Sequence, residues 1–190
     1  MALGKQAKTL SDAQQRVILN HLSQGRHPKR NTVMFLLSCD AALRAKEIAL
    51  LEWSMLTDAT GALTDEIRLV DRASKGRSGG VVFMSKRLKL ALIDYSRDQE
   101  LTGQIVKSQS GKSMAPQVVT NWFFNLYRDL GYEGCSSHSG RRTAITNWAR
   151  KISSVGGSLR DVQALARHSS IAMTQRYIEV SEDACRRVVG

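Results

Sequence analysis

Two histidines, an arginine and a tyrosine in the last third of the chain have the residue types and spacing to act on a phosphate. Arg141 follows His138 by three residues, and Tyr177 follows His168 by nine. An arginine guanidinium neutralises phosphoryl oxygens through a two-pronged hydrogen bond. A histidine donates to such oxygens or carries a proton, and a tyrosine hydroxyl can attack phosphorus to form a covalent ester. Together these four side chains could bind one phosphate group, transfer a proton and attack its phosphorus.

A further arginine, Arg44, lies far upstream, with Glu47 three residues after it. On a helix the two would share a face, so the carboxylate can hold the guanidinium in place. A solvated helix surface is the alternative for Arg44. Likewise, His168 alone would be read as a core or capping histidine, and Tyr177 as an aromatic anchor. The order and spacing of the whole set favour chemistry.

Four segments resemble the motifs of the tyrosine recombinase (phage integrase) family. The run 137–143 resembles its H-x-x-R box, and 166–170 followed by Tyr177 resembles its G-H-x-S…Y box. Upstream, 42–48 resembles the arginine box G-L-R-x-x-E-[IL], and Lys75 sits where the family carries a lysine on a β-hairpin. The four motifs occur in the family's order and span most of the chain.

The resemblance implies that the protein cleaves and rejoins DNA strands through a 3′-phosphotyrosyl intermediate, without a metal or other cofactor. Tyr177 would be the nucleophile and Lys75 the general acid, although a lysine in a Gly/Ser-rich turn is more often a surface charge. The catalytic set that it implies is Arg44, Lys75, His138, Arg141, His168 and Tyr177, with Glu47 in support. The arginines expected on DNA are Arg72, Arg77, Arg142, Arg167 and Arg176. The implied partners are double-stranded DNA with inverted half-sites and further copies of the chain, as a tetramer on DNA.

Two residues depart from the family's motifs. Arg167 stands where a glycine usually precedes the second histidine, so we expect it to shift that loop or to add a phosphate contact. Gly140 replaces the common leucine before Arg141, which we expect to loosen the packing under that arginine. Neither change removes a catalytic group.

The composition agrees with a DNA-binding globular protein. The chain has 190 residues, 42% of them hydrophobic, and a net charge of +11 from 28 Lys+Arg against 17 Asp+Glu. Such a basic excess favours an anionic partner. No apolar run approaches the roughly 20 residues that span a membrane. The three cysteines indicate reduced cytosolic thiols. The family resemblance implies a cytoplasmic protein that is bacterial and nucleoid-associated, or one encoded by a phage or mobile element. No His/Asp/Glu cluster has metal-ligand spacing, and the sequence before Gly111-Lys112-Ser113 does not form a P-loop.

The pattern predicts a mainly α fold with a small antiparallel β-sheet (α+β). We expect helices over about 12–24, 31–39 and 44–53, a β-hairpin around 67–84, and further helices with apolar stripes in the second half. Ser11-x-x-Gln14 and Ser158-x-x-Asp161 are capping-box signals. The whole chain, 1–190, is expected to be a single catalytic domain, with 1–10 loose and basic.

About forty residues precede Arg44, too few for the N-terminal core-binding domain of the usual family member, so we expect that domain to be absent. The chain is then a short recombinase, similar in plan to the fimbrial phase-variation invertases, or a fragment of a longer integrase. Two other functions stay open: strand nicking like that of a type IB topoisomerase, and a catalytically weak DNA-binding regulator of recombination.

Overall fold

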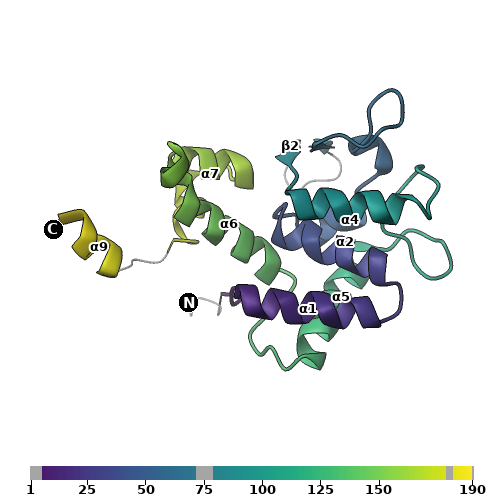
Figure 1. The fold of residues 1–190 in the computed structure, drawn as a ribbon, viewed down its shortest axis with the longest axis horizontal. Coiled ribbons are helices and arrows are strands. Elements are labelled where there is room, and N and C mark those ends of the chain that lie inside the picture. Colours follow the sequence, from purple (N-terminus) through teal and green to yellow (C-terminus); the bar gives the residue numbers. More distant parts are fainter. Residues whose placement is uncertain (1–5, 72–78, 179–181, 190) are drawn as a thin grey trace. The chain divides into compact units, whose positions relative to one another are not determined.

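The computed structural model describes residues 6–71, 79–178 and 182–189. They divide into two compact units, 1–144 and 145–190, and the boundary falls inside helix α6. The α-helices are α1 (Asp12–Gln24), α2 (Pro28–Cys39), α3 (Ala45–Ala49), α4 (Lys86–Ser96), α5 (Pro116–Asp129), α6 (Ser139–Lys151), α7 (Leu159–Ala166), α8 (Ile171–Gln175) and α9 (Glu182–Val189). The described residues also form the 3-10 helices η1 (Trp53–Met55) and η3 (Ile152–Val155) and the strands β1 (Glu66–Leu69) and β2 (Gly80–Phe83). The predicted mainly helical fold with a small antiparallel sheet is confirmed (Figure 1).

Helix α2 is the central helix of the first unit. Every residue from Val33 to Cys39 is buried, and α1, α3 and α4 pack against it (Figure 1). A helix covered on several sides must be apolar around most of its circumference, as this one is. It begins at Pro28, three residues before the predicted start. Proline fits the first turn of a helix because the N–H that it lacks would have no intrahelical partner there.

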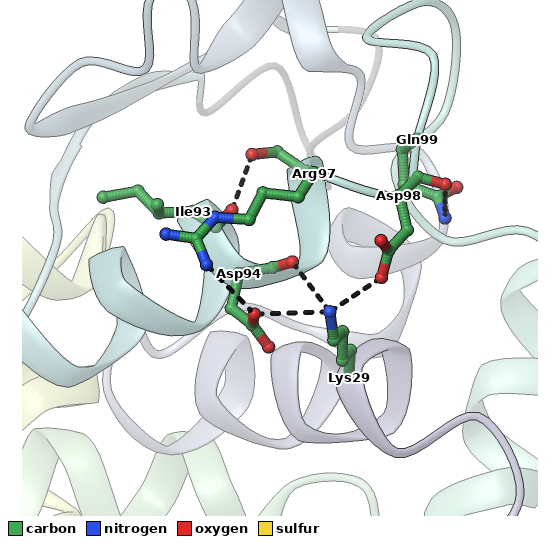
Figure 2. A network of polar contacts seen from close by, with 7 residues as sticks. Lys29, Ile93, Asp94, Arg97, Asp98 and Gln99 are labelled. Atoms are coloured by element: carbon green, nitrogen blue, oxygen red, sulfur yellow. Dashed lines mark hydrogen bonds and ion pairs between the residues drawn. The ribbon is translucent and has the colours of Figure 1, made fainter.

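Helices α2 and α4 are antiparallel and are joined by ion pairs at both ends. At one end, Lys29 of α2 contacts Asp94 at 3.3 Å and Asp98 at 2.7 Å (Figure 2). At the other end, the carboxylate of Asp40, directly after α2, accepts hydrogen bonds from Ser85 and Arg87, at the start of α4. The first cluster is exposed to solvent, whereas the Asp40 side chain is only 6% exposed.

The predicted β-hairpin is confirmed. Strands β1 and β2 pair antiparallel, with Glu66 opposite Phe83 and Leu69 opposite Gly80. Ile67 and Leu69 face the core of the unit, as alternation along a half-buried strand requires. Three predicted site residues, the general-acid candidate Lys75 and the DNA-binding candidates Arg72 and Arg77, lie outside the described residues.

Helix α3 is shorter than predicted, because the chain leaves it to pair with a distant segment. The Ile105 amide donates to the Leu51 carbonyl at 2.9 Å, and the Trp53 amide donates to the Gly103 carbonyl at 3.0 Å. These bonds take the place of further helical ones after Ala49. Trp53 itself is fully buried in η1, so the apolar residues after Arg44 fill the core without belonging to one helix.

Both predicted capping boxes are confirmed. Ser11 accepts from the Gln14 amide and Gln14 accepts from the Ser11 amide, which starts α1; Ser158 and Asp161 start α7 in the second unit. In that unit α7 packs against α8 and η3. Among the described residues, the helices are too short or too polar to cross a bilayer.

Candidate active site

Arg44 is held by Glu47 through both its main chain and its side chain. One carboxylate oxygen of Glu47 accepts from the Arg44 amide at 2.8 Å, and the other accepts from the Arg44 Nη1 atom at 2.8 Å. Glu47 is fully buried, whereas the Arg44 side chain is 21% exposed. Because the buried carboxylate bonds both the main chain and the side chain of Arg44, the guanidinium is already oriented before a ligand binds. The predicted supporting role of Glu47 thus has a geometric basis.

Arg141 is anchored to the segment that carries Arg44. Its Nη1 atom donates to the carbonyl of Ala42, two residues before Arg44. Ala42 has φ +51°, in the left-handed region that costs a non-glycine residue roughly 1–2 kcal/mol. Its position matches the glycine of the family's arginine box. The turn between α2 and α3 therefore keeps the left-handed conformation without the glycine, and its carbonyl is directed at Arg141.

Gly140 packs tightly, which contradicts the expectation that it loosens the packing under Arg141. A Cβ atom at this position would collide with Ser38 Oγ, and it would lie 2.8 Å from Ser38 Cβ and 3.0 Å from Cys39 Sγ. The first turn of α6 therefore lies directly on the end of α2, and no larger residue fits between them. Glycine here permits close approach of two helices.

We expect Gly140→Ala to lower the free energy of unfolding by about 1–3 kcal/mol, the usual cost of overpacking a core. The sign of this change in the free energy of unfolding is informative, because replacing a glycine by alanine inside a helix ordinarily stabilises the protein. Urea unfolding followed by tryptophan fluorescence measures the change. Ser38→Ala should relieve part of the cost when combined with Gly140→Ala; a stabilising Gly140→Ala would contradict the packing described.

In the second unit, the ring of Tyr177 stacks on the imidazole of His168. The ring centroids are 5.3 Å apart and the planes are inclined by 27°. His168 is buried, and its Nδ1 atom is hydrogen-bonded to Thr174 Oγ1 at 2.9 Å. The main chain of Tyr177 is fixed as well, because its carbonyl accepts from Thr146 Oγ1 at 3.1 Å and its amide donates to the Thr174 carbonyl. The structure thus brings together the histidine and the tyrosine that the sequence separates by nine residues.

Arg167 takes the conformation of the glycine that it replaces. Its φ is +53°, and the hydrogen bonds that end α7 run from its amide to Ala164 and from the His168 amide to Gln163. This is the Schellman pattern, in which glycine is the usual left-handed residue. The backbone before His168 is therefore formed as glycine would form it. A contact of Arg167 with phosphate stays a prediction.

The remaining predicted residues lie near the start of α6 and the end of α8. His138 is exposed and directly precedes α6, while Arg142, in the helix, donates to Gln6. Arg176 is exposed in the turn that precedes Tyr177. Sequence reasoning missed Thr174 as the partner of His168. Its position three residues before the tyrosine, on the same short helix as the serine cap, was the available signal.

Within the described residues there is no group of three or more His, Cys, Asp or Glu side chains that could hold a metal ion.

The sequence model of the phage integrase family matches residues 8–183. This chain belongs to the phage integrase family.

Among curated proteins, this integrase-family chain is similar to the tyrosine recombinase XerC of Rickettsia prowazekii, with 26% identity over 156 residues. That match covers 80% of the chain and 48% of the relative, so the chain spans about half the length of this relative. Among solved structures, it is similar to XerA recombinase (TM-score 0.72, 18% identity, 99% of this chain and 64% of that one). The Tn1549 transposon integrase in complex with transposon right end DNA is also similar (TM-score 0.74, 14% identity, 98% of this chain and 66% of that one). These structures share the fold of the chain.

Proposed function

We propose that this chain is the catalytic domain of a tyrosine site-specific recombinase, which cleaves and rejoins double-stranded DNA. The observation that carries the proposal is the Tyr177 ring stacked on His168, whose other contacts fix both residues. Family membership and the held arginines, Arg44 and Arg141, support it. We also propose that 1–190 is one catalytic domain, because the family model matches residues 8–183.

In this reaction the Tyr177 hydroxyl loses its proton and attacks the scissile phosphorus. A bond forms between the tyrosine oxygen and phosphorus as the bond from phosphorus to the 5′-oxygen breaks. The products are a 3′-phosphotyrosyl protein and a free 5′-hydroxyl. His138, exposed before α6, is our candidate for the base that accepts the tyrosine proton. Because the ester preserves the phosphodiester energy, a 5′-hydroxyl from another duplex can reverse the step and exchange strands.

Arg44 and Arg141 bind the non-bridging oxygens of the phosphate and stabilise the charge that accumulates in the transition state. Glu47 and the Ala42 carbonyl hold these two guanidiniums, so little reorganisation is needed when DNA binds. His168 donates a further hydrogen bond to the phosphate through its Nε2 atom in the tautomer whose Nδ1 accepts from the Thr174 hydroxyl. With the roles assigned to these residues, the reaction needs no nucleotide cofactor.

Lys75 is proposed as the general acid that protonates the departing 5′-oxygen. We expect Lys75→Ala to cleave an ordinary substrate poorly but to cleave one with a sulfur at the 5′-bridging position nearly as well as the unmodified protein. A thiolate leaves without a proton, so the missing acid no longer matters. Single-turnover cleavage of the two substrates measures the effect. Equal defects would assign Lys75 to backbone binding, and Lys86 would be tested next.

The proposed partner is DNA that carries inverted half-sites, on which protomers assemble as a tetramer. The excess of 28 Lys+Arg over 17 Asp+Glu supplies the charge for phosphate contacts. Arg72, Arg77, Arg142, Arg167 and Arg176 are the candidates for those contacts, and a cytoplasmic location agrees with this role.

A pool of nicked duplexes tests the function on every candidate target sequence at once. The sequence around each nick is randomised, and the short strand released by cleavage diffuses away, which traps the covalent intermediate. We expect adducts that resist denaturing electrophoresis, enriched in one sequence family. A second duplex with a free 5′-hydroxyl should then be joined to the trapped strand. Binding without adducts would indicate a regulator, and adducts that reseal only their own duplex would indicate a topoisomerase.

A further inference from the structure

A buried carboxylate outside the predicted catalytic set lies where three catalytic elements meet. Asp40 directly follows α2 and precedes Arg44 by four residues. Arg87 donates to both of its oxygens, from Nε at 2.7 Å and from Nη2 at 2.5 Å, and Ser85 Oγ donates at 2.5 Å. Three donors on one carboxylate fix its position and satisfy its charge in a nearly dry location.

The first element held by this cluster is the turn that carries Arg44. From Asp40 the chain continues through Ala42, whose carbonyl receives Arg141, to Arg44. The turn is closed by the Leu43 amide, which donates to the Leu37 carbonyl at 3.0 Å. Since Ala42 is held in a left-handed conformation without a glycine, the turn depends on outside contacts to keep its shape. Asp40 supplies such contacts at the start of the turn.

The second element is the first part of α6, which carries Arg141. The Nη2 atom of Arg87 also donates to Gln15 Oε1 at 2.7 Å, and Gln15 Nε2 donates to the Leu10 carbonyl at 3.4 Å. The Leu10 amide in turn donates to Thr143 Oγ1 at 2.8 Å, two residues after Arg141. A continuous series of hydrogen bonds therefore joins Arg87 to the helix of the second arginine.

The third element is the β-hairpin. Ser85 lies two residues after the end of β2 and also caps α4, because its Oγ accepts from the Leu88 amide at 3.1 Å. Its hydroxyl therefore connects Asp40 to the strand that leads out of the hairpin turn. The Asp40–Arg87–Ser85 cluster, called here the Asp40 cluster, therefore adjoins the Arg44 turn and the hairpin directly, and it is connected to α6 through Gln15 and Leu10.

We propose that Asp40 and Arg87 are positioning residues that set Arg44 and Arg141 against the scissile phosphate, an inference that rests on the proposed function. They touch no substrate themselves. The cluster acts by fixing the carbonyl of Ala42 and the first turn of α6, on which the two guanidiniums depend. A small shift at a reacting centre lowers the cleavage rate strongly while leaving most binding contacts intact.

The chain offers a matched control in the other ion pair between the same helices. Lys29 and Asp98 join α2 to α4 at the opposite end, also at 2.7 Å (Figure 2). Asp40→Asn and Asp98→Asn make the same chemical change, one near Arg44 and one far from it along α2. A general loosening of the helix pair would affect both variants, whereas positioning affects only the first.

The test compares single-turnover cleavage, DNA affinity in a Tyr177→Phe background, and amide hydrogen exchange. For Asp40→Asn we expect cleavage to fall roughly 10- to 100-fold, the range for a small misplacement of reacting groups, with affinity nearly unchanged. Exchange of the Leu43 amide should accelerate. Asp98→Asn should match the unmodified protein in all three measurements. Arg87→Gln, at a half-exposed position, provides a second variant if Asp40→Asn does not fold.

A substrate with a neutral methylphosphonate at the scissile position separates positioning from simple loss of structure. In a methylphosphonate, a methyl group replaces the negatively charged non-bridging oxygen that an arginine would neutralise. Misplacement of Arg44 or Arg141 should therefore slow the cleavage of this substrate less. The Asp40→Asn defect should shrink on it. An equal defect on both substrates, unchanged exchange at Leu43, or an equal effect of Asp98→Asn would each overturn the inference. If the unmodified protein forms no adduct, the proposed function fails, whereas the exchange measurement still reports on the cluster.

Discussion

Tyr177→Phe is expected to abolish covalent attachment to DNA while leaving DNA binding nearly unchanged. The substitution removes only the phenolic oxygen. The ring can still stack on His168, and the main-chain bonds of residue 177 to Thr146 and Thr174 do not involve its side chain. Adduct formation on nicked duplexes and affinity by gel shift measure the two properties.

Tyr132→Phe is the matched control, because Tyr132 is a partly buried tyrosine that packs against the core of the first unit. It should form adducts at the normal rate. Adducts formed by Tyr177→Phe would move the nucleophile to another tyrosine and would refute the assignment of the site.

Arg44→Ala and Arg141→Ala are each expected to slow cleavage by about 10³-fold or more, by analogy with arginines that stabilise phosphoryl-transfer transition states. Arg142→Ala should cost far less, because Arg142 donates to Gln6 whereas Arg141 is anchored to the Arg44 turn. Single-turnover rates on nicked duplexes make the comparison.

Arg141 is buried and bonded to the Ala42 carbonyl, so its removal also affects stability. Arg141→Lys keeps the positive charge but loses the two-pronged donor, and it should still be strongly impaired. Urea unfolding of each variant separates the two effects. Greater sensitivity of Arg142 than of Arg141 would show that the wrong residue of the adjacent pair was assigned.

Local patterns in the sequence predicted much of the fold. Capping boxes act over three residues, so Ser11 with Gln14 and Ser158 with Asp161 could be recognised directly. The hairpin was recognisable from strand-like residues on either side of a glycine-rich turn. The end of α3 was not, because pairing of Leu51 with Ile105 joins residues 54 positions apart.

In the candidate site, too, features set by local motif spacing could be predicted, whereas features set by contacts between distant residues could not. Motif spacing predicted Arg44, Glu47, His168 and Tyr177 as site residues, and in the structure Arg44 contacts Glu47 and His168 contacts Tyr177. Gly140 was misjudged because glycine allows both looseness and close approach, and only the position of Ser38 decides between them.

The Asp40 cluster could not be predicted from the sequence. Asp40 and Arg87 are 47 residues apart, and neither belongs to a recognised motif. Their pairing depends on the antiparallel arrangement of α2 and α4, which local signals do not specify. Residues that position a catalytic side chain are in general harder to recognise from sequence than the catalytic residue itself. Their identity depends on how the elements pack, whereas that of the catalytic residue depends on the reaction.

The measurement that tests the proposed function most directly is the chemical identity of the trapped adduct. Protein linked to a nicked duplex is digested with protease and nuclease, and the nucleotide-bearing peptide is sequenced by mass spectrometry. We expect the nucleotide on Tyr177, linked through a 3′-phosphate, with a free 5′-hydroxyl on the released strand. A linkage to a different residue, a 5′-phosphate linkage, or no adduct from the folded protein on any sequence in the pool would contradict the proposed reaction.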